Sequence, residues 1–121
     1  MTAPAPIIIP GAPYYGVMTV HAEISIVPIA GGRGTSMSKE VAAAFDAIRK
    51  IKNIKAILTA LGTQVEARDL GSVLLAVGAA HRAARSAGAK RVISTVRIDE
   101  RLDKAQTLHD KVKSVRRKLK K

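Results

Sequence analysis

Residues 60–70 read Ala-Leu-Gly-Thr-Gln-Val-Glu-Ala-Arg-Asp-Leu, and they say more about the architecture than any other stretch. Two strand-like runs, 54–61 and 63–68, meet at Gly62, and Asp69 is a natural helix N-cap. Glu66 lies in the middle of the second run. A carboxylate within a strand indicates a surface that faces water or a ligand, because burying an unpaired charge is unfavourable. The stretch predicts a small domain of sheet and helix with a polar patch on the sheet, which favours a binding module over an enzyme.

Hydrophobic periodicity predicts the elements around this hairpin. Residues 17–29 and 91–99 alternate as strands, and helices are expected after a cap at Ser36 or Ser38, from Asp69 to Gly88, and near the C-terminus. The apolar stripes expected on these helices are Val41, Phe45, Ile48 and Ile51, then Leu70, Val73, Leu74, Val77, His81 and Ala84, and finally Leu108, Val112, Val115 and Leu119.

This order of elements predicts an α+β fold, namely a ferredoxin-like βαββαβ sandwich with a four-stranded antiparallel sheet and an extra C-terminal helix. Both main helices would cover one face of the sheet and leave the other face open. We expect three regions: a proline-rich N-terminal arm (1–16), the ferredoxin-like domain (17–115) and a basic C-terminal tail (116–121).

Composition limits the possible chemistry of the 121-residue chain. Cysteine is absent, which excludes disulfides, thiolate metal sites and cysteine nucleophiles. Asn and Gln are scarce, which hints at a thermophilic source. Neither a signal peptide nor an apolar run long enough to span a bilayer is visible, so we expect a cytoplasmic protein without a membrane partner.

The net charge of +12 is concentrated at the C-terminus. Such a basic tail attracts polyanions by releasing counterions, so nucleic acid is one candidate partner. The alternative is a solvated helix end, where cations are favoured by the helix dipole. The sheet offers no aromatic platform for stacking single-stranded bases. The candidate polyanion-binding residues are Arg116, Arg117, Lys118, Lys120 and Lys121.

A polar row is expected on the open face of the sheet. Carboxylates and hydroxyls there could bind a small heteroaromatic molecule, since a carboxylate accepts from an exocyclic amine or shares a proton with a ring nitrogen. The alternative is a set of cross-strand ion pairs within a subunit interface, for example Glu66 with Arg97. The row consists of Glu23, Ser25, Gln64, Glu66, Thr95 and Arg97.

Other motifs are weaker. The glycine-rich segment 31–36 precedes a helix, so Gly32, Gly34 and Thr35 form a candidate anion-binding loop, although it matches neither a P-loop nor a dinucleotide fingerprint. The alternative is that this segment only connects the strand to the helix. His81 is expected to be a hydrogen-bonded core residue. The sequence indicates no metal site and no catalytic residues.

An ordered set of segments resembles the MTH1187/YkoF-like thiamine-binding family (the UPF0045 group). The resemblance covers residues 19–115. The segments are 21–28 (His-Ala-Glu-Ile-Ser-Ile-Val-Pro), 34–36 (Gly-Thr-Ser), 61–67 (Leu-Gly-Thr-Gln-Val-Glu-Ala), Ala80-His81, Gly88, Arg91-Val92, Thr95, 98–101 (Ile-Asp-Glu-Arg) and 111–115 (Lys-Val-Lys-Ser-Val). The arm before Met18, the longer basic tail and Ala67, where many relatives have glycine, depart from the family pattern.

The resemblance implies homodimers and commonly homotetramers that bind thiamine or its hydroxymethylpyrimidine moiety, with no known reaction and no required cofactor. By position, Ser36 and Glu66 are implied pocket residues, joined on the sheet by Glu23 and Thr95. The sequence thus predicts a non-catalytic ligand-binding protein that acts as carrier, buffer or sensor. The alternatives are a nucleic-acid-associated protein acting through its tail and a purely structural oligomer.

Overall fold

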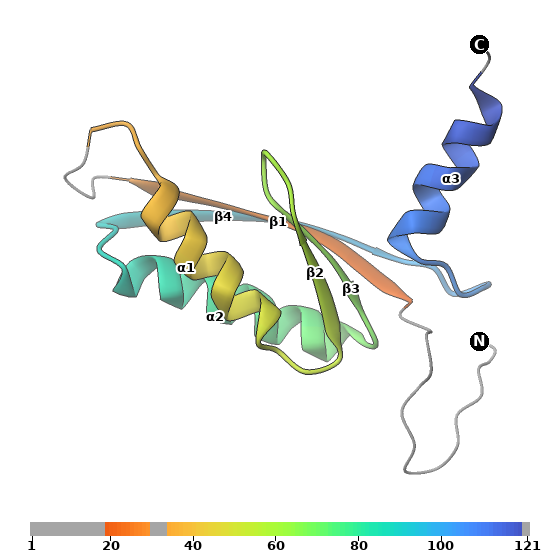
Figure 1. Cartoon of the computed structure of the whole chain (residues 1–121). Coiled ribbons are helices and arrows are strands. Elements are labelled where there is room, and N and C mark those ends of the chain that lie inside the picture. Colours follow the sequence, from red (N-terminus) through yellow and green to blue (C-terminus); the bar gives the residue numbers. More distant parts are fainter. Residues whose placement is uncertain (1–18, 30–33, 120–121) are drawn as a thin grey trace.

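The structure is a computed structural model that describes residues 19–29 and 34–119 (Figure 1). The predicted arm (1–16), Gly32, Lys120 and Lys121 lie outside the described residues. Four antiparallel strands form one sheet in the order β2-β3-β1-β4. The elements follow the chain as β1 (Val20–Ile29), α1 (Ser38–Arg49), β2 (Ile54–Leu58), β3 (Thr63–Ala67), α2 (Leu70–Ser86), β4 (Arg91–Glu100) and α3 (Leu108–Lys118). The α+β, ferredoxin-like βαββαβ prediction with an extra C-terminal helix is confirmed.

Local chemistry explains where two of the helices begin. The Asp69 side chain accepts a hydrogen bond from the Ser72 amide at 2.7 Å, as expected of an N-cap. Thr107 and Asp110 form a reciprocal capping box at the start of α3. The predicted cap of α1 by Ser36 or Ser38 is wrong, because Met37 occupies the N-cap position and provides no side-chain hydrogen bond.

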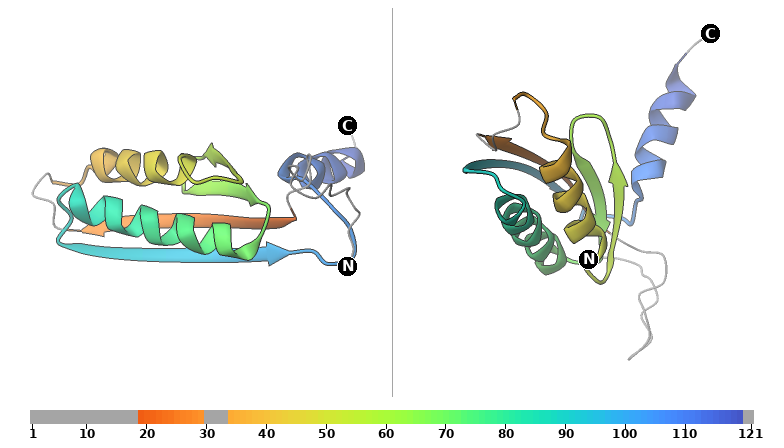
Figure 2. Two further views of the ribbon diagram at one scale, coloured as in Figure 1. Left: turned by 90° about the horizontal axis from the view of Figure 1, so that it is seen from below. Right: turned by 60° about the vertical axis from the view of Figure 1, so that its left-hand side comes forward.

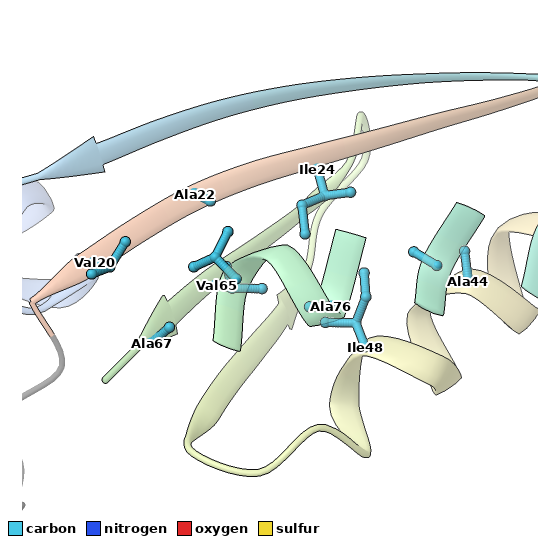
Figure 3. Packing of buried hydrophobic residues seen from close by; sticks show 10 residues of the cluster. Val20, Ala22, Ile24, Ala44, Ile48, Val65, Ala67 and Ala76 are labelled. Atoms are coloured by element: carbon cyan, nitrogen blue, oxygen red, sulfur yellow. The ribbon is translucent and has the colours of Figure 1, made fainter. Parts of the chain in front are cut away.

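The core lies between the sheet and the pair α1–α2, which together cover one face (Figure 2). Figure 3 shows its packing, with Ile24 and Val65 from the sheet facing Ile48 of α1 and Ala76 of α2. The buried hydrophobic residues of this cluster are Val20, Ala22, Ile24, Ala44, Ile48, Val65, Ala67, Val73, Ala76 and Ala80.

The apolar stripe predicted for α2 is partly wrong. The buried row consists of Ser72, Val73, Ala76, Ala80 and Ala84, whereas Leu70 and Leu74 are exposed. Small side chains allow α2 to approach the sheet and α1 closely, and larger leucines would not fit into that space. The row of alanines therefore determines which side of α2 is buried.

The other face of the sheet is the one on which the candidate site lies. Helices α1 and α2 leave it open, and α3 follows β4 to that side of the sheet (Figure 2). No residue of α3 is fully buried. Within ranges 19–29 and 34–119, no helix combines the length and the apolar character needed to cross a bilayer.

Candidate functional site

Strand register gathers charged side chains on the open face. His21 of β1 is paired with Glu66 of β3 on one side and with Asp99 of β4 on the other. Lys55 of β2 is paired with Glu66, so that one row crosses all four strands. Directly paired residues of antiparallel strands point to the same face. The next row along the sheet consists of Ile57, Gln64, Glu23 and Arg97.

Glu66 is the central carboxylate of this face, and only 4% of its surface is exposed. Its Oε1 accepts a hydrogen bond from the Leu108 amide at 3.0 Å, in the first turn of α3. Its Oε2 lies 3.6 Å from Lys55 Nζ. A carboxylate has acceptor capacity beyond these two contacts, and the positive end of the α3 dipole favours its negative charge. Glu66 therefore both anchors α3 and keeps acceptor positions for a further partner.

The cross-strand pair between Glu66 and Arg97, which was the example given for the alternative, does not form. Arg97 instead lies 3.5 Å from Glu23 Oε1, its direct partner in the register between β1 and β4. Strand β1 separates β3 from β4 in the sheet order, which places Glu66 and Arg97 on non-adjacent strands. Gln64 completes the second row by donating to Glu23 Oε2 at 3.4 Å.

Two further contacts hold the start of α3 against the sheet. His21 Nε2 lies 2.7 Å from the Gln106 carbonyl oxygen, just before the helix. Lys111 in the first turns of α3 forms an ion pair with Asp99. This hydrogen bond from Lys111 holds the pKa of Asp99 below its usual range. Together with Glu66, these residues hold the first turn of α3 at the open face.

Two grooves run along the two sides of α3. The first, which we call the β2-side groove, has a volume of about 580 Å3 and is lined by Lys55, Ile57, Gln64, Glu66, Leu108, His109, Val112, Lys113 and Arg116. The second, the β4-side groove, has a volume of about 700 Å3 and is lined by His21, Ala22, Glu23, Gln64, Arg97, Ile98, Asp99, Glu100, Leu108, Lys111 and Val112. They share Gln64, Leu108 and Val112, so they adjoin beneath the helix. Apolar walls with a few polar groups are typical of sites for small molecules.

The structure brings together some of the residues predicted for the site. Glu66 lies in the β2-side groove and Glu23 in the β4-side groove, and Gln64 lines both. Ser25 and Thr95 are paired with each other in the next row along the open face. Ser25 also lines a third cavity, of about 210 Å3, beside the β2–β3 hairpin.

The loop before α1 is not part of this constellation. Gly34, Thr35 and Ser36 are exposed and follow the end of β1 that lies farthest from Glu66 (Figure 1). Among the candidate polyanion-binding residues, Arg116 lines the β2-side groove. Arg117 and Lys118 are exposed in the last turn of α3 and line neither groove.

Sequence reasoning missed His21, Asp99 and Lys111 as parts of the site. His21 lies two residues before Glu23 in β1, and residues two apart in a strand share a face. That shared face was the available signal for His21. Lys111 had no comparable signal, because its role depends on how α3 docks.

His81 takes the structural role expected of it. Its Nδ1 lies 2.6 Å from Ser94 Oγ, and the side chain is half-buried between α2 and β4. In the part of the chain that the structure describes, no group of three His, Cys, Asp or Glu side chains is arranged to hold a metal ion.

The buried position of His21 makes the stability of the fold sensitive to pH. Burial lowers the pKa of His21, and the nearby Lys111 charge lowers it further. The folded state thus binds a proton on the His21 imidazole more weakly than the unfolded state does. Neutral His21 therefore contributes to the stability of the folded state. This contribution is complete above the unfolded histidine pKa of about 6.5 and is lost as the pH falls toward the lower pKa of the folded state. We expect the parent protein to lose more thermal stability than the His21→Gln variant between about pH 7.5 and about pH 5.5.

Thermal unfolding of both proteins across this pH range measures the effect. His109→Gln is the matched control, because His109 is exposed on α3, and it should respond to pH like the parent. An equal loss of stability in the parent and in His21→Gln would contradict the role assigned to His21.

Comparison with known proteins adds evidence that is independent of this geometry. Residues 22–116 match a family model described as thiamine-binding protein. A UPF0045 protein of Methanothermobacter thermautotrophicus is 42% identical over 100 residues, covering 83% of this chain and 99% of the relative. The UPF0045 protein MJ1052 of Methanocaldococcus jannaschii is 38% identical over 96 residues, which cover 79% of this chain and 91% of the relative.

Solved structures show the same fold. The crystal structure of MJ1052 aligns with a TM-score of 0.71, covering 79% of this chain and 94% of that chain. A putative thiamine biosynthesis/salvage protein from Thermotoga maritima aligns with a TM-score of 0.64 at 20% identity, and the alignment covers 79% of this chain and 97% of that chain. At that identity the second comparison supports the fold alone.

Proposed function

The chain belongs to the thiamine-binding protein family, also named UPF0045, and from this premise we propose that it is a non-catalytic protein that binds thiamine or its hydroxymethylpyrimidine moiety. The observation that supports this most is the buried Glu66 carboxylate, which lines the β2-side groove beneath α3. The protein would act as a carrier, buffer or sensor, with no required cofactor.

The aminopyrimidine ring suits the groove in shape and in hydrogen bonding. Ile57, Leu108 and Val112 provide apolar surface for a flat ring. The Glu66 carboxylate can accept from the exocyclic amine or share a proton with a ring nitrogen, and Gln64 offers an amide beside it. Glu23, in the adjoining groove, supplies a second carboxylate whose negative charge favours a cationic ligand. In this proposal the aminopyrimidine does not contact the other three predicted residues. Ser25 and Thr95 lie farther along the sheet, and Ser36 lies in the loop before α1.

We also propose that the protein works as a homodimer or homotetramer. Val112 and Val115 of α3 and Leu119 just after it are exposed, as are Val27 and Ile93 on the open face. Exposed apolar surface of this kind is typical of association surfaces. A partner copy could therefore complete the grooves from the side that α3 leaves open.

Calorimetric titration of the full chain with thiamine, and separately with hydroxymethylpyrimidine, tests the proposed function. We expect saturable binding of both compounds, because both carry the aminopyrimidine. Oxythiamine, in which a carbonyl replaces the exocyclic amine, should bind at least about tenfold more weakly, since it loses a hydrogen bond to a charged acceptor. The stoichiometry would show whether two chains share one site.

Absence of binding by both thiamine and hydroxymethylpyrimidine would contradict the proposal. A nucleic-acid role would then be the next hypothesis to test. Its signature is binding that weakens steeply with salt and is lost when residues 116–121 are deleted.

A further inference from the structure

The β2-side groove contains an excess of positively charged side chains. Lys55, Lys113 and Arg116 contribute three cationic side chains, and Glu66 contributes the single carboxylate. His109 adds an imidazole on the same side of α3. Thiamine itself is a cation because of its thiazolium ring. A cation that enters a groove with net positive charge is repelled, so unmodified thiamine is a poor electrostatic match for this groove as a whole.

The cations are arranged along one side of the groove. His109, Lys113 and Arg116 are spaced by four and then three residues, so they share one face of α3. This stripe extends for about 10 Å along the helix axis. Lys55 of β2 lies across the groove from it and is held near Glu66 at 3.6 Å. The groove therefore has a carboxylate at its floor and cations along its rim.

The rim cations are available for a ligand. Within residues 19–29 and 34–119, neither Lys113 nor Arg116 lies within 4.0 Å of a carboxylate as an ion pair. Arg and Lys bind phosphate oxygens well, and Arg can do so through two parallel hydrogen bonds. Unpaired cations that converge on a groove favour an anionic group there.

We propose that the β2-side groove selects a phosphorylated aminopyrimidine, with the ring against Glu66 and the phosphate held by Lys113 and Arg116. This inference rests on the proposed function and names the ligand class of the same site. Thiamine phosphates and hydroxymethylpyrimidine phosphate share the required chemistry, namely an aminopyrimidine at one end and a phosphate at the other. Phosphorylation reverses the unfavourable charge of thiamine and makes the ligand complementary to the groove.

The test compares each ligand with and without phosphate, using the full chain at one fixed ionic strength. Thiamine is compared with thiamine diphosphate, and hydroxymethylpyrimidine with its phosphate. We expect at least about tenfold tighter binding of the phosphorylated member of each pair. The double variant Lys113→Ala/Arg116→Ala should lose this advantage and still bind unphosphorylated thiamine.

The matched control is Arg117→Ala/Lys118→Ala, which removes the same charges from the same helix. Neither of these side chains lines a groove, so the phosphate advantage should remain. Loss of the advantage in both double variants to the same extent would overturn the proposal, because it would indicate a general effect of net charge. Inorganic pyrophosphate that binds without competing with thiamine diphosphate would overturn it as well, because the two must share the phosphate site.

The outcomes separate this inference from the proposed function. Binding of thiamine with no gain from phosphate overturns the phosphate site and leaves thiamine binding intact. Absence of binding for all four compounds overturns both.

Discussion

Replacing Glu66 by glutamine is expected to weaken thiamine binding by about 100-fold, or about 3 kcal/mol. The amide keeps the size of the side chain and an oxygen that can accept from the Leu108 amide, so α3 should stay anchored. It lacks the negative charge that strengthens hydrogen bonds from the exocyclic amine and from a protonated ring nitrogen. Calorimetric titration of the variant measures the loss, and circular dichroism verifies that it is folded.

Glu23→Gln is the matched control for this experiment. It makes the same chemical change on the same face of the sheet, in the adjoining β4-side groove. We expect it to lower thiamine affinity by about threefold, because Glu23 is only partly buried and already contacts Arg97 and Gln64. Unchanged affinity in Glu66→Gln, or a larger loss in Glu23→Gln, would contradict the assignment of the ring to Glu66.

The Ile48→Ala substitution is expected to lower the free energy of unfolding by about 3–4 kcal/mol. Ile48 of α1 is fully buried and contributes one of the largest side chains of the core. Truncation removes apolar contacts and leaves a cavity that neighbouring backbone can fill only in part. For a domain with a total stability of about 5–15 kcal/mol, this is a large fraction. Urea denaturation followed by circular dichroism measures the change.

The control for this experiment is Leu58→Ala at the end of β2, where 57% of the residue's surface is exposed. Its loss should remain below about 1 kcal/mol. Both variants must be compared with the parent at equal protein concentration, because self-association would add to apparent stability. Equal destabilisation by the two substitutions would contradict the location of the core.

Local sequence patterns were sufficient to predict the sheet and its two covering helices. Alternation in 17–29 and 91–99 correctly separated the buried face, with Val20, Ala22 and Ile24, from the open face. Alternation is informative here because successive side chains of a strand point to opposite faces. Asp69 predicted the start of α2 because its side chain satisfies a free backbone amide.

Helix faces were harder to predict. Leucines at 70 and 74 were expected in the core, but α2 buries its alanines instead. Hydrophobicity ranks leucine above alanine, whereas close approach between layers selects for small side chains. Which of these effects dominates depends on the distance between α2 and its neighbours, and this distance is a property of the assembled fold.

The position of α3 could not be predicted either. The hydrogen bonds that place it join Glu66 to Leu108, 42 residues later, and His21 to Gln106, 85 residues later. Each contact joins a strand to the segment that begins α3, and no local periodicity encodes such a pairing. The sequence therefore identified Glu66 and Glu23 as candidate ligand-binding residues but did not reveal the grooves in which they lie.

The most direct test of the account is a crystal structure of the full chain with thiamine bound at saturating concentration. We expect the aminopyrimidine in the β2-side groove beneath α3, with its amine or ring nitrogen within hydrogen-bonding distance of a Glu66 carboxylate oxygen. A ring bound elsewhere, for example beside Ser36 in the loop before α1, would contradict it.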